Sequence, residues 1–321
     1  MKSLAFLVAV SALSIAMLCT SCKKDEHHDP VIEGLTLENF PVIDGSTSTD
    51  PLVNLLAARL LGYKAEWKQE GAADITWRIT TDLPQNFIEQ KLTSTKTHQS
   101  LINVIDGKAD LTFSARTLSP DEKAYAAEKG VTLIETPVAL DALVFITHPD
   151  NPLKTITHEQ LVDIYSARIK NWNQVGGQDL KIMPLIRNQN SGSQELMESL
   201  VMNGPIPEEF MEDHEEFQIV ISMHPVFTYV GGYPDALGYT VYYYKENMIR
   251  NQSPAKTIAV NGIYPDKKTI GDRTYPFTAE VYLMIRSDLD KSSMAYRIYE
   301  FMQTSAGKQI IDESGYVILN P

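Results

Sequence analysis

Cysteine is the scarcest residue in this chain of 321 residues, and its two copies, Cys19 and Cys22, both lie near the start. The chain after Cys22 therefore contains no thiol, so neither disulfides nor thiol chemistry can stabilise the fold. There is also no internal repeat and no low-complexity block. A hydrophobic content of 43% is enough for two packed lobes and too little for a polytopic membrane protein.

Basic residues are also few. The chain has 28 Lys and Arg against 41 Asp and Glu, a formal net charge of −13. This balance argues against nucleic acid or an anionic membrane surface as a partner, but it leaves room for a small anion held by local donors. The seven histidines are scattered without the spacing of metal ligands, so we expect no metal and no cofactor.

The first 21 residues have the pattern of a secretory signal peptide. An apolar run from Leu4 to Leu18 follows one lysine and ends in small residues, and it is short for a bilayer span. The segment resembles a bacterial lipoprotein signal, which implies lipidation at Cys22 and a tether over residues 22–39. The alternative is a C-x-x-C redox or metal site with His27 and His28, which the position inside an export signal disfavours.

From residue 40 onward, strand-like and helix-like segments alternate. A short buried strand at 40–45 precedes a helix at 52–62, and the pattern recurs to a long closing helix at 293–314. Thr97 and Ser119 are candidate N-caps. Pro137 is expected to divide the apolar stretch 131–149 into two extended pieces. Such alternation indicates an α/β protein with a parallel or mixed sheet and, at this length, two lobes.

Three loops at predicted strand ends share hydroxyl groups, glycine or arginine. In open α/β sheets such loops converge at the carboxyl edge, where ligands bind. Hydroxyl donors, helix N-termini and a guanidinium suit a tetrahedral oxyanion. The candidate residues are Thr47, Ser48 and Thr49 in the first loop, Ser114 and Arg116 in the second, and Arg187, Ser191, Gly192 and Ser193 in the third.

The third loop, "RNQNSGS", resembles the R-x-x-x-S-G-T motif of the phosphate-binding subunit of bacterial ABC importers, and the similarity extends over nearly the whole chain after residue 40. The resemblance implies an α/β, two-lobed periplasmic-binding-protein (type II) fold with mixed sheets and two crossings between the lobes. Lobe one would comprise residues 40–141 and 241–321, and lobe two residues 142–240. The nine loop residues above would bind inorganic phosphate.

The same resemblance implies a monomeric solute-binding lipoprotein, not an enzyme, that is held at a bacterial membrane on the periplasmic or cell-surface side. It would deliver phosphate to the permease subunits of an ABC transporter. One departure concerns selectivity: Ala115 stands where the family often has an aspartate that accepts the proton of hydrogen phosphate. We therefore expect weak discrimination against sulfate. Arg116 is expected to add a second positive charge.

Two other functions remain open at the level of sequence. A surface oxyanion sensor or scaffold could have the same fold and signal to a partner without transport. An enzyme acting on phosphate esters would need a general base or metal in the cleft. His98 is the histidine closest to the three loops, and the G-x-S-x-G elbow of many hydrolases is absent. The acidic segment 207–217 is interpreted as a solvated surface.

Overall fold

The computed structural model describes residues 32–69, 76–210 and 215–319. The predicted signal peptide, Cys22 and its neighbouring histidines lie outside these ranges, as do parts of the tether and of the acidic segment 207–217. Among the described residues, no helix is both long enough and apolar enough to cross a membrane.

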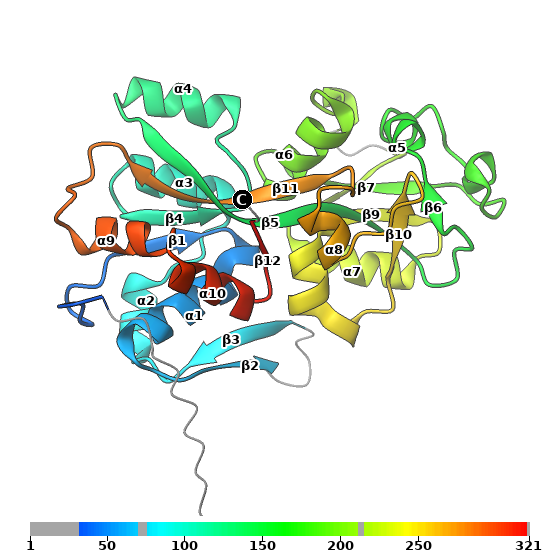
Figure 1. Ribbon diagram of the computed structural model, residues 1–321. Coiled ribbons are helices and arrows are strands. Elements are labelled where there is room, and N and C mark those ends of the chain that lie inside the picture. Colours follow the sequence, from blue (N-terminus) through cyan, green and yellow to red (C-terminus); the bar gives the residue numbers. More distant parts are fainter. Residues whose placement is uncertain (1–31, 70–75, 211–214, 320–321) are drawn as a thin grey trace, which may run out of the picture.

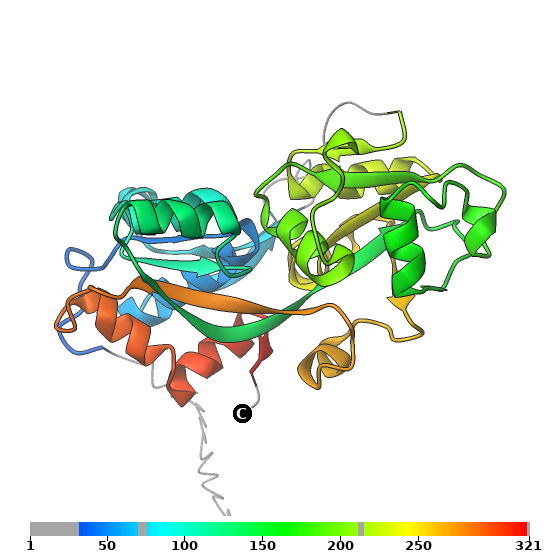
Figure 2. The same ribbon diagram turned by 90° about the horizontal axis from the view of Figure 1, so that it is seen from above.

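Two lobes share one mixed sheet, and the long strand β5 (Leu133–Thr147) runs through both of them (Figures 1 and 2). The strand order is β1-β4-β11-β5-β9-β7-β8. The first part of β5 pairs antiparallel with β11, from Leu133 to Ala142, and its last five residues pair antiparallel with β9. The predicted two-lobed α/β fold with a mixed sheet is therefore confirmed.

Lobe one is built around the start of β5, with helices on both faces of the sheet (Figure 1). Strand β1 pairs parallel with β4, and β4 pairs antiparallel with β11. A separate hairpin, β2–β3, packs on α1. The strands of this lobe are β1 (Ile43–Gly45), β2 (Ala65–Gln69), β3 (Trp77–Thr81), β4 (Leu111–Ser114), β11 (Thr278–Arg286) and β12 (Val317–Ile318). Its helices are α1 (Asp50–Leu61), α2 (Gln85–Lys91), α3 (Thr97–Ile105), α4 (Pro120–Glu128), α9 (Met294–Phe301) and α10 (Ser305–Glu313).

Lobe two is built around the end of β5. Strands β9 and β7 pair in parallel, as do β7 and β8. Its strands are β6 (Thr155–Ile156), β7 (Met183–Arg187), β8 (Gln218–Val220), β9 (Ala236–Val241) and β10 (Lys256–Val260). Its helices are α5 (His158–Tyr165), α6 (Gly192–Leu196), which continues as the π-helical segment Met197–Met202, and α7 (Met223–Gly232). Helix α8 (Lys267–Gly271) lies between the lobes in sequence and contacts β5 and β12.

The pairing of strand β10 affects where the boundary between the lobes is drawn. It pairs antiparallel with β5 at Phe145, Ile146 and Thr147 and parallel with β6, so residues 256–260 pack with the strands of lobe two. The division at 141/142 and 240/241 had assigned this segment to lobe one. The boundaries between the lobes stay a prediction, in which we now place residues 256–260 in lobe two.

Three local expectations are wrong. Pro137 does not interrupt β5, because the β5–β11 pairing has an irregularity there: Val281 pairs with Ala139 and Tyr282 with Pro137. The closing helix at 293–314 is divided in two, since the Thr304 hydroxyl accepts from Gly307 N and caps a new helix. The N-cap of α3 is Lys96, not Thr97.

A buried carboxyl group lies where β5 passes between the lobes. Asp141 Oδ1 accepts from the backbone N–H groups of Ala142 and Tyr243, at 2.8 and 2.9 Å. Burial raises the pKa of this carboxyl to about 7. The Tyr243 ring stacks on Tyr316 at 3.7 Å, so the chain leaving β9 is fixed to the C-terminal segment of lobe one.

Candidate functional site

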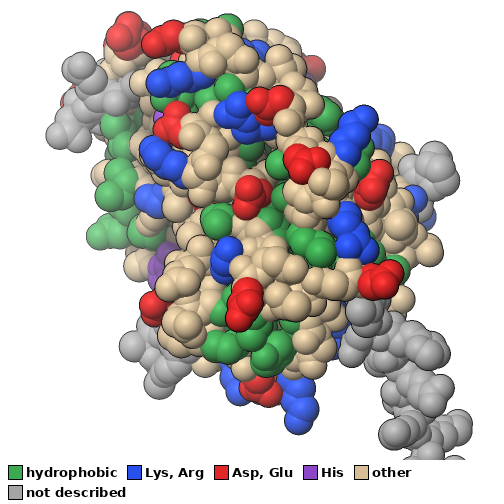
Figure 3. All heavy atoms as spheres, turned by 90° about the vertical axis from the view of Figure 1, so that its left-hand side faces the viewer, with side chains coloured by type: hydrophobic (Ala, Val, Ile, Leu, Met, Phe, Trp, Pro, Cys, Tyr) green, Lys and Arg blue, Asp and Glu red, His purple; other side chains and the backbone are tan. Residues whose placement is uncertain are grey.

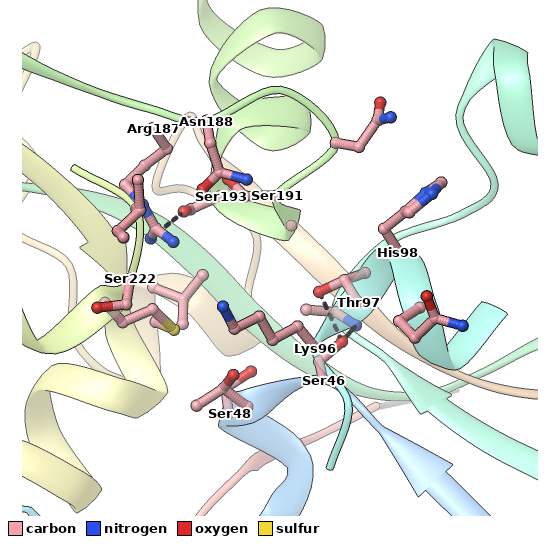
Figure 4. A pocket seen from close by; sticks show the side chains of 18 of the residues that line it. Ser46, Ser48, Lys96, Thr97, His98, Arg187, Asn188, Ser191, Ser193 and Ser222 are labelled. Carbon is pink, nitrogen blue, oxygen red and sulfur yellow. Dashed lines mark hydrogen bonds between the residues drawn. The ribbon is translucent and has the colours of Figure 1, made fainter. Parts of the chain in front are cut away.

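A cavity of about 410 Å³ lies between the two lobes, where loops after β1 and β7 meet the start of α3 (Figure 4). Its lining includes both lobes and is rich in hydroxyl and amide groups. No aspartate or glutamate belongs to the lining among the described residues. The lining consists of Ser46, Thr47, Ser48, Thr95, Lys96, Thr97, His98, Gln99, Ala115, Arg187, Asn188, Gln189, Asn190, Ser191, Gly192, Ser193, Ile221, Ser222, Met223, His224, Val241 and Tyr244.

The first predicted loop supplies hydroxyl groups from lobe one. Thr47 and Ser48 line the cavity in the short 3₁₀ turn η1 (Thr47–Thr49), which leads directly into α1. The turn is fixed from behind, because the Tyr316 hydroxyl donates to the Ser48 carbonyl at 2.9 Å. Thr49 is absent from the lining, since its hydroxyl donates to the carbonyls of Ser46 and Phe113. Its role is to close the turn.

Ser46 belongs to the same hydroxyl-rich loop, directly before the predicted binding residues, but was not predicted to bind the ligand. Its Oγ accepts from the backbone N–H of Ala115 at 3.0 Å and lies 2.9 Å from the Thr97 hydroxyl. It therefore joins three segments at the cavity wall: the loop after β1, the loop after β4 and the start of α3.

The segment 93–97, "TSTKT", was also missed, and it forms part of the cavity wall. It follows a single bridge between Leu92 and Ile43, not a regular strand, so the rule that ligand loops follow strands did not find it. Asp44, buried on β1, holds the segment by accepting from the Thr95 N–H and hydroxyl at 3.0 and 2.7 Å. The available signal was compositional, since three threonines and a serine surround one lysine, much as hydroxyl residues fill 46–49.

Arg187 ends β7 and reaches the cavity from lobe two (Figure 4). Its side chain is 5% exposed, with Nε donating to the Val220 carbonyl at 2.7 Å and Nη1 donating to Ser193 Oγ at 3.0 Å. No carboxylate among the described residues pairs with it. Burial lowers the pKa of the guanidinium from its usual value, although an arginine remains protonated in proteins. Its charge is thus oriented by neutral acceptors.

Ser191, Gly192 and Ser193 line the cavity beside Arg187, as predicted. Ser191 is the N-cap of α6, and its hydroxyl accepts from Gln194 N at 3.2 Å. A Cβ atom on Gly192 would lie 2.5 Å from Thr97 Oγ1, so lobe two approaches lobe one closely at this glycine. The loop needs glycine for a close approach between lobes, not for a positive φ.

The second predicted loop does not reach the cavity with its functional side chains. Ser114 Oγ donates to the Arg116 carbonyl at 2.6 Å and is fully buried. Arg116 forms two hydrogen bonds with Glu122, at 2.7 and 2.9 Å, and donates to the Asn190 carbonyl at 3.3 Å. The expectation of a second charge from Arg116 therefore fails in this structure, because Glu122 neutralises that charge. Only Ala115 of this loop lines the cavity.

Glu122 is buried beside Arg116 and also contacts the partly exposed His98. Burial by itself would raise the pKa of Glu122, but hydrogen bonds from Arg116 and its charge outweigh burial and lower the pKa overall. His98 Nδ1 lies 2.8 Å from Glu122 Oε1. Within the described residues, no group of three or more His, Cys, Asp or Glu could hold a metal ion. The cavity therefore offers donors and positive charge, which suit binding of a small anion.

Comparison with known proteins agrees with this fold. A family model described as the PBP superfamily domain matches residues 42–299. The phosphate-binding protein PstS of Borreliella burgdorferi is 31% identical over 213 residues, which cover 64% of this chain and 71% of that protein. A solved ABC-type phosphate transport receptor from Vibrio cholerae has 22% identity and a TM-score of 0.60, covering 87% of this chain and 99% of that one. A structure of PstS from Borrelia burgdorferi has 24% identity and a TM-score of 0.52, covering 88% and 99%.

The fold and the cleft between two lobes thus define a binding protein of the periplasmic type. The matched segment is most of the chain, and it includes every residue of the cavity lining. The chain belongs to the PBP superfamily and, within it, to the family of PstS phosphate-binding subunits of phosphate ABC importers.

Proposed function

We propose that this protein captures inorganic phosphate in the cavity between its lobes and delivers it to the permease of an ABC transporter. One observation carries the proposal: Arg187 is a buried cation in this cavity, and no carboxylate lines the cavity among the residues that the structure describes. Its relatives include a phosphate-binding protein and an ABC-type phosphate transport receptor, which supports the same conclusion.

The residues proposed to bind the anion are those of the cavity wall. Arg187 would provide a charged hydrogen-bond donor from lobe two, and hydroxyl groups would donate from both lobes. The set comprises Thr47, Ser48, Arg187, Ser191, Gly192 and Ser193, as the sequence predicted, with Ser46, Thr95 and Thr97 added. An anion contacted by both lobes would favour the closed arrangement through its higher affinity for that state.

Size limits the affinity of such a ligand. Phosphate has five non-hydrogen atoms, and a ceiling of roughly 1.5 kcal/mol per atom caps its binding at about 7 to 8 kcal/mol. This free energy corresponds to a dissociation constant of about micromolar, which is adequate for a scavenging receptor.

The remaining parts of the proposal concern location and assembly. Cleavage of residues 1–21 and lipidation of Cys22 would anchor a monomeric protein to a bacterial membrane on the periplasmic or cell-surface side, with residues 22–39 as its tether. The lobes are proposed to divide as 40–141 with 241–321 and 142–240, apart from 256–260. The protein would bind and release its ligand without covalent chemistry, so it is not an enzyme.

Calorimetric titration with phosphate tests the proposal. We expect Arg187→Met to weaken binding by about 1.5 to 3 kcal/mol, since a hydrogen bond to a charged group is worth roughly that amount. Arg168→Met is the matched control, because Arg168 is an exposed lobe-two arginine paired with Asp163 and away from the cavity. Equal phosphate affinity in wild type and Arg187→Met would remove Arg187 from the site, and absence of binding by wild type would refute the function.

A further inference from the structure

Lys96 has an unusual backbone conformation for a residue that is not glycine. Its φ is 71° and its ψ is 164°, at the position immediately before α3. This region of φ and ψ is occupied almost only by glycine, and such conformations persist when the surrounding structure imposes them, often at ligand sites. Lys96 therefore adopts a backbone conformation that a lysine ordinarily disfavours.

The surrounding structure fixes both neighbours of Lys96. Asp44 accepts two hydrogen bonds from Thr95, and its Oδ2 also accepts from Asn103 Nδ2 at 2.7 Å. On the other side, the Thr97 hydroxyl lies 2.9 Å from Ser46 Oγ. The backbone at 95–97 is thus held by partly buried polar contacts at Thr95 and a buried one at Thr97, which set the direction in which the Lys96 side chain leaves the chain.

That direction is into the cavity. Figure 4 shows the Lys96 side chain extending from the lobe-one wall between Ser48 and Ser222, with Arg187 on the opposite wall. Its ammonium group makes no hydrogen bond or ion pair with any residue that the structure describes. Other lysines, such as Lys108 and Lys170, contact carboxylates at 2.8 and 2.6 Å.

We infer that Lys96 is a ligand-binding cation and that, with Arg187, it makes the cavity a site for doubly charged tetrahedral oxyanions, accepting sulfate as well as hydrogen phosphate. The inference rests on the proposed function and names its substrate class. Two cations that approach from opposite lobes match a ligand of charge −2. A site that accepts the phosphate O–H rejects an analogue without it by about 10⁴ to 10⁵-fold, but no carboxylate is present in the described lining to do so.

Calorimetry at pH 8 with inorganic phosphate and with sulfate tests the inference in four proteins. They are the wild type, Lys96→Met, Lys96→Arg and the control Lys123→Met, which alters an exposed lysine of α4 away from the cavity. We expect Lys96→Met to lower the affinity for both anions about tenfold, as for the loss of one charged contact at a partly solvated position. Lys96→Arg keeps the charge and should stay within a few-fold of wild type. Lys123→Met should match wild type.

Lys96→Gly separates the contribution of the lysine charge to binding from the strain of its backbone conformation. Glycine adopts the observed φ and ψ without strain, so this variant should raise the Tm by up to about 4 °C while losing anion affinity as Lys96→Met does. A glycine variant with wild-type affinity for both anions would overturn the role of Lys96.

The remaining outcomes separate the inference from the function on which it rests. Wild-type protein that binds neither anion would refute the proposed function itself. Wild-type binding of phosphate that is unchanged in Lys96→Met would refute only the role of Lys96. Sulfate binding by wild type more than about a hundredfold weaker than phosphate binding would overturn the substrate class, because a built acceptor is what produces larger ratios.

Discussion

Two arginines at strand ends, one in each lobe, show how differently a buried charge can be used. Arg116 follows β4 in lobe one and Arg187 ends β7 in lobe two, and each is only 5% exposed. Arg116 is paired through two hydrogen bonds with Glu122, a fully buried carboxylate. Arg187 donates to a hydroxyl and a backbone carbonyl, which are both neutral.

The difference decides which arginine can bind a ligand. Burial of an unpaired charge costs free energy, and a carboxylate partner removes most of that cost, so Arg116 has little to gain from an external anion. Arg187 lacks such a partner among the described residues, and an oxyanion in the cavity would complete its environment. Arg116 instead donates to the Asn190 carbonyl across the gap between lobes, which makes it part of the contact that holds the lobes together.

Removing the carboxylate would make Arg116 resemble Arg187, and it is the change with the largest expected effect. Breaking a buried pair by deleting one partner costs about 3 to 5 kcal/mol, so Glu122→Gln should lower the free energy of unfolding by about 3 kcal/mol at pH 7. Chemical denaturation measures this quantity. Glu128→Gln, an exposed position on the same helix, serves as the control.

The same pair predicts a pH dependence of stability. The pKa of Glu122 is lower in the folded state than its usual value, so its stabilisation is complete above the unfolded pKa and disappears as the pH falls through the folded pKa. The difference in stability between wild type and Glu122→Gln should therefore narrow below about pH 4. A difference that is constant from pH 7 to pH 3, or absent at pH 7, would contradict the ion pair.

Gly192 tests the contact between the lobes on the Arg187 side. In Gly192→Ala the new Cβ would lie 2.5 Å from Thr97 Oγ1, so the closed arrangement must open slightly or shift Thr97. Overpacking of this kind costs about 1 to 3 kcal/mol. We expect this cost to appear as weaker phosphate binding, which calorimetry measures. The stability of the ligand-free protein should change less, because open lobes avoid the clash.

Gly204→Ala is the matched control for this substitution, since a Cβ there meets nothing within 4 Å. Equal losses of affinity in the two alanine variants would show that the contact between Gly192 and Thr97 does not matter for binding. Small-angle X-ray scattering with phosphate gives a second measure, because Gly192→Ala should contract less than wild type when the ligand is added.

The fold and part of the cavity could be predicted from the sequence because they depend on local patterns. Alternating strands and helices defined the α/β class, and "RNQNSGS" placed a guanidinium, hydroxyls and glycine at one strand end. Both patterns are readable over a few residues. Thr47 and Ser48 were found for the same reason, since hydroxyl residues precede a helix start.

What could not be predicted depends on contacts between distant segments. Arg116 appeared available because its partner is a helical residue six positions later, although the capping box of Ser119 and Glu122 was a signal that this glutamate faces back toward the loop. Lys96 was overlooked because Asp44, fifty-two positions earlier, creates its conformation by binding Thr95. The residue types could be read directly in both cases, but their partners could be assigned only from the tertiary structure.

The smallest expected effect concerns the lobe contact on the Arg116 side. Asn190 Nδ2 donates to Asp121 Oδ2 at 2.9 Å across the cleft, and its φ is 62°, which glycine tolerates. Asn190→Gly removes this hydrogen bond and keeps the backbone and the bond from Arg116. A partly exposed hydrogen bond contributes about 0.5 to 1 kcal/mol, so phosphate affinity should fall only about two- to fivefold.

Asn203→Gly is the control that isolates this small effect. Asn203 has a φ of 52°, lies in lobe two outside the cavity, and therefore gains the same backbone relief without losing a lobe contact. Competition titration of both variants against wild type resolves a twofold difference in affinity. If the Asn190 variant binds phosphate as tightly as the Asn203 variant, the hydrogen bond from Arg116 to the carbonyl of residue 190 is sufficient for the lobe contact on that side. A loss beyond tenfold would instead place Asn190 in direct contact with the ligand, because a single neutral bond at the rim of the cleft is too weak to produce it.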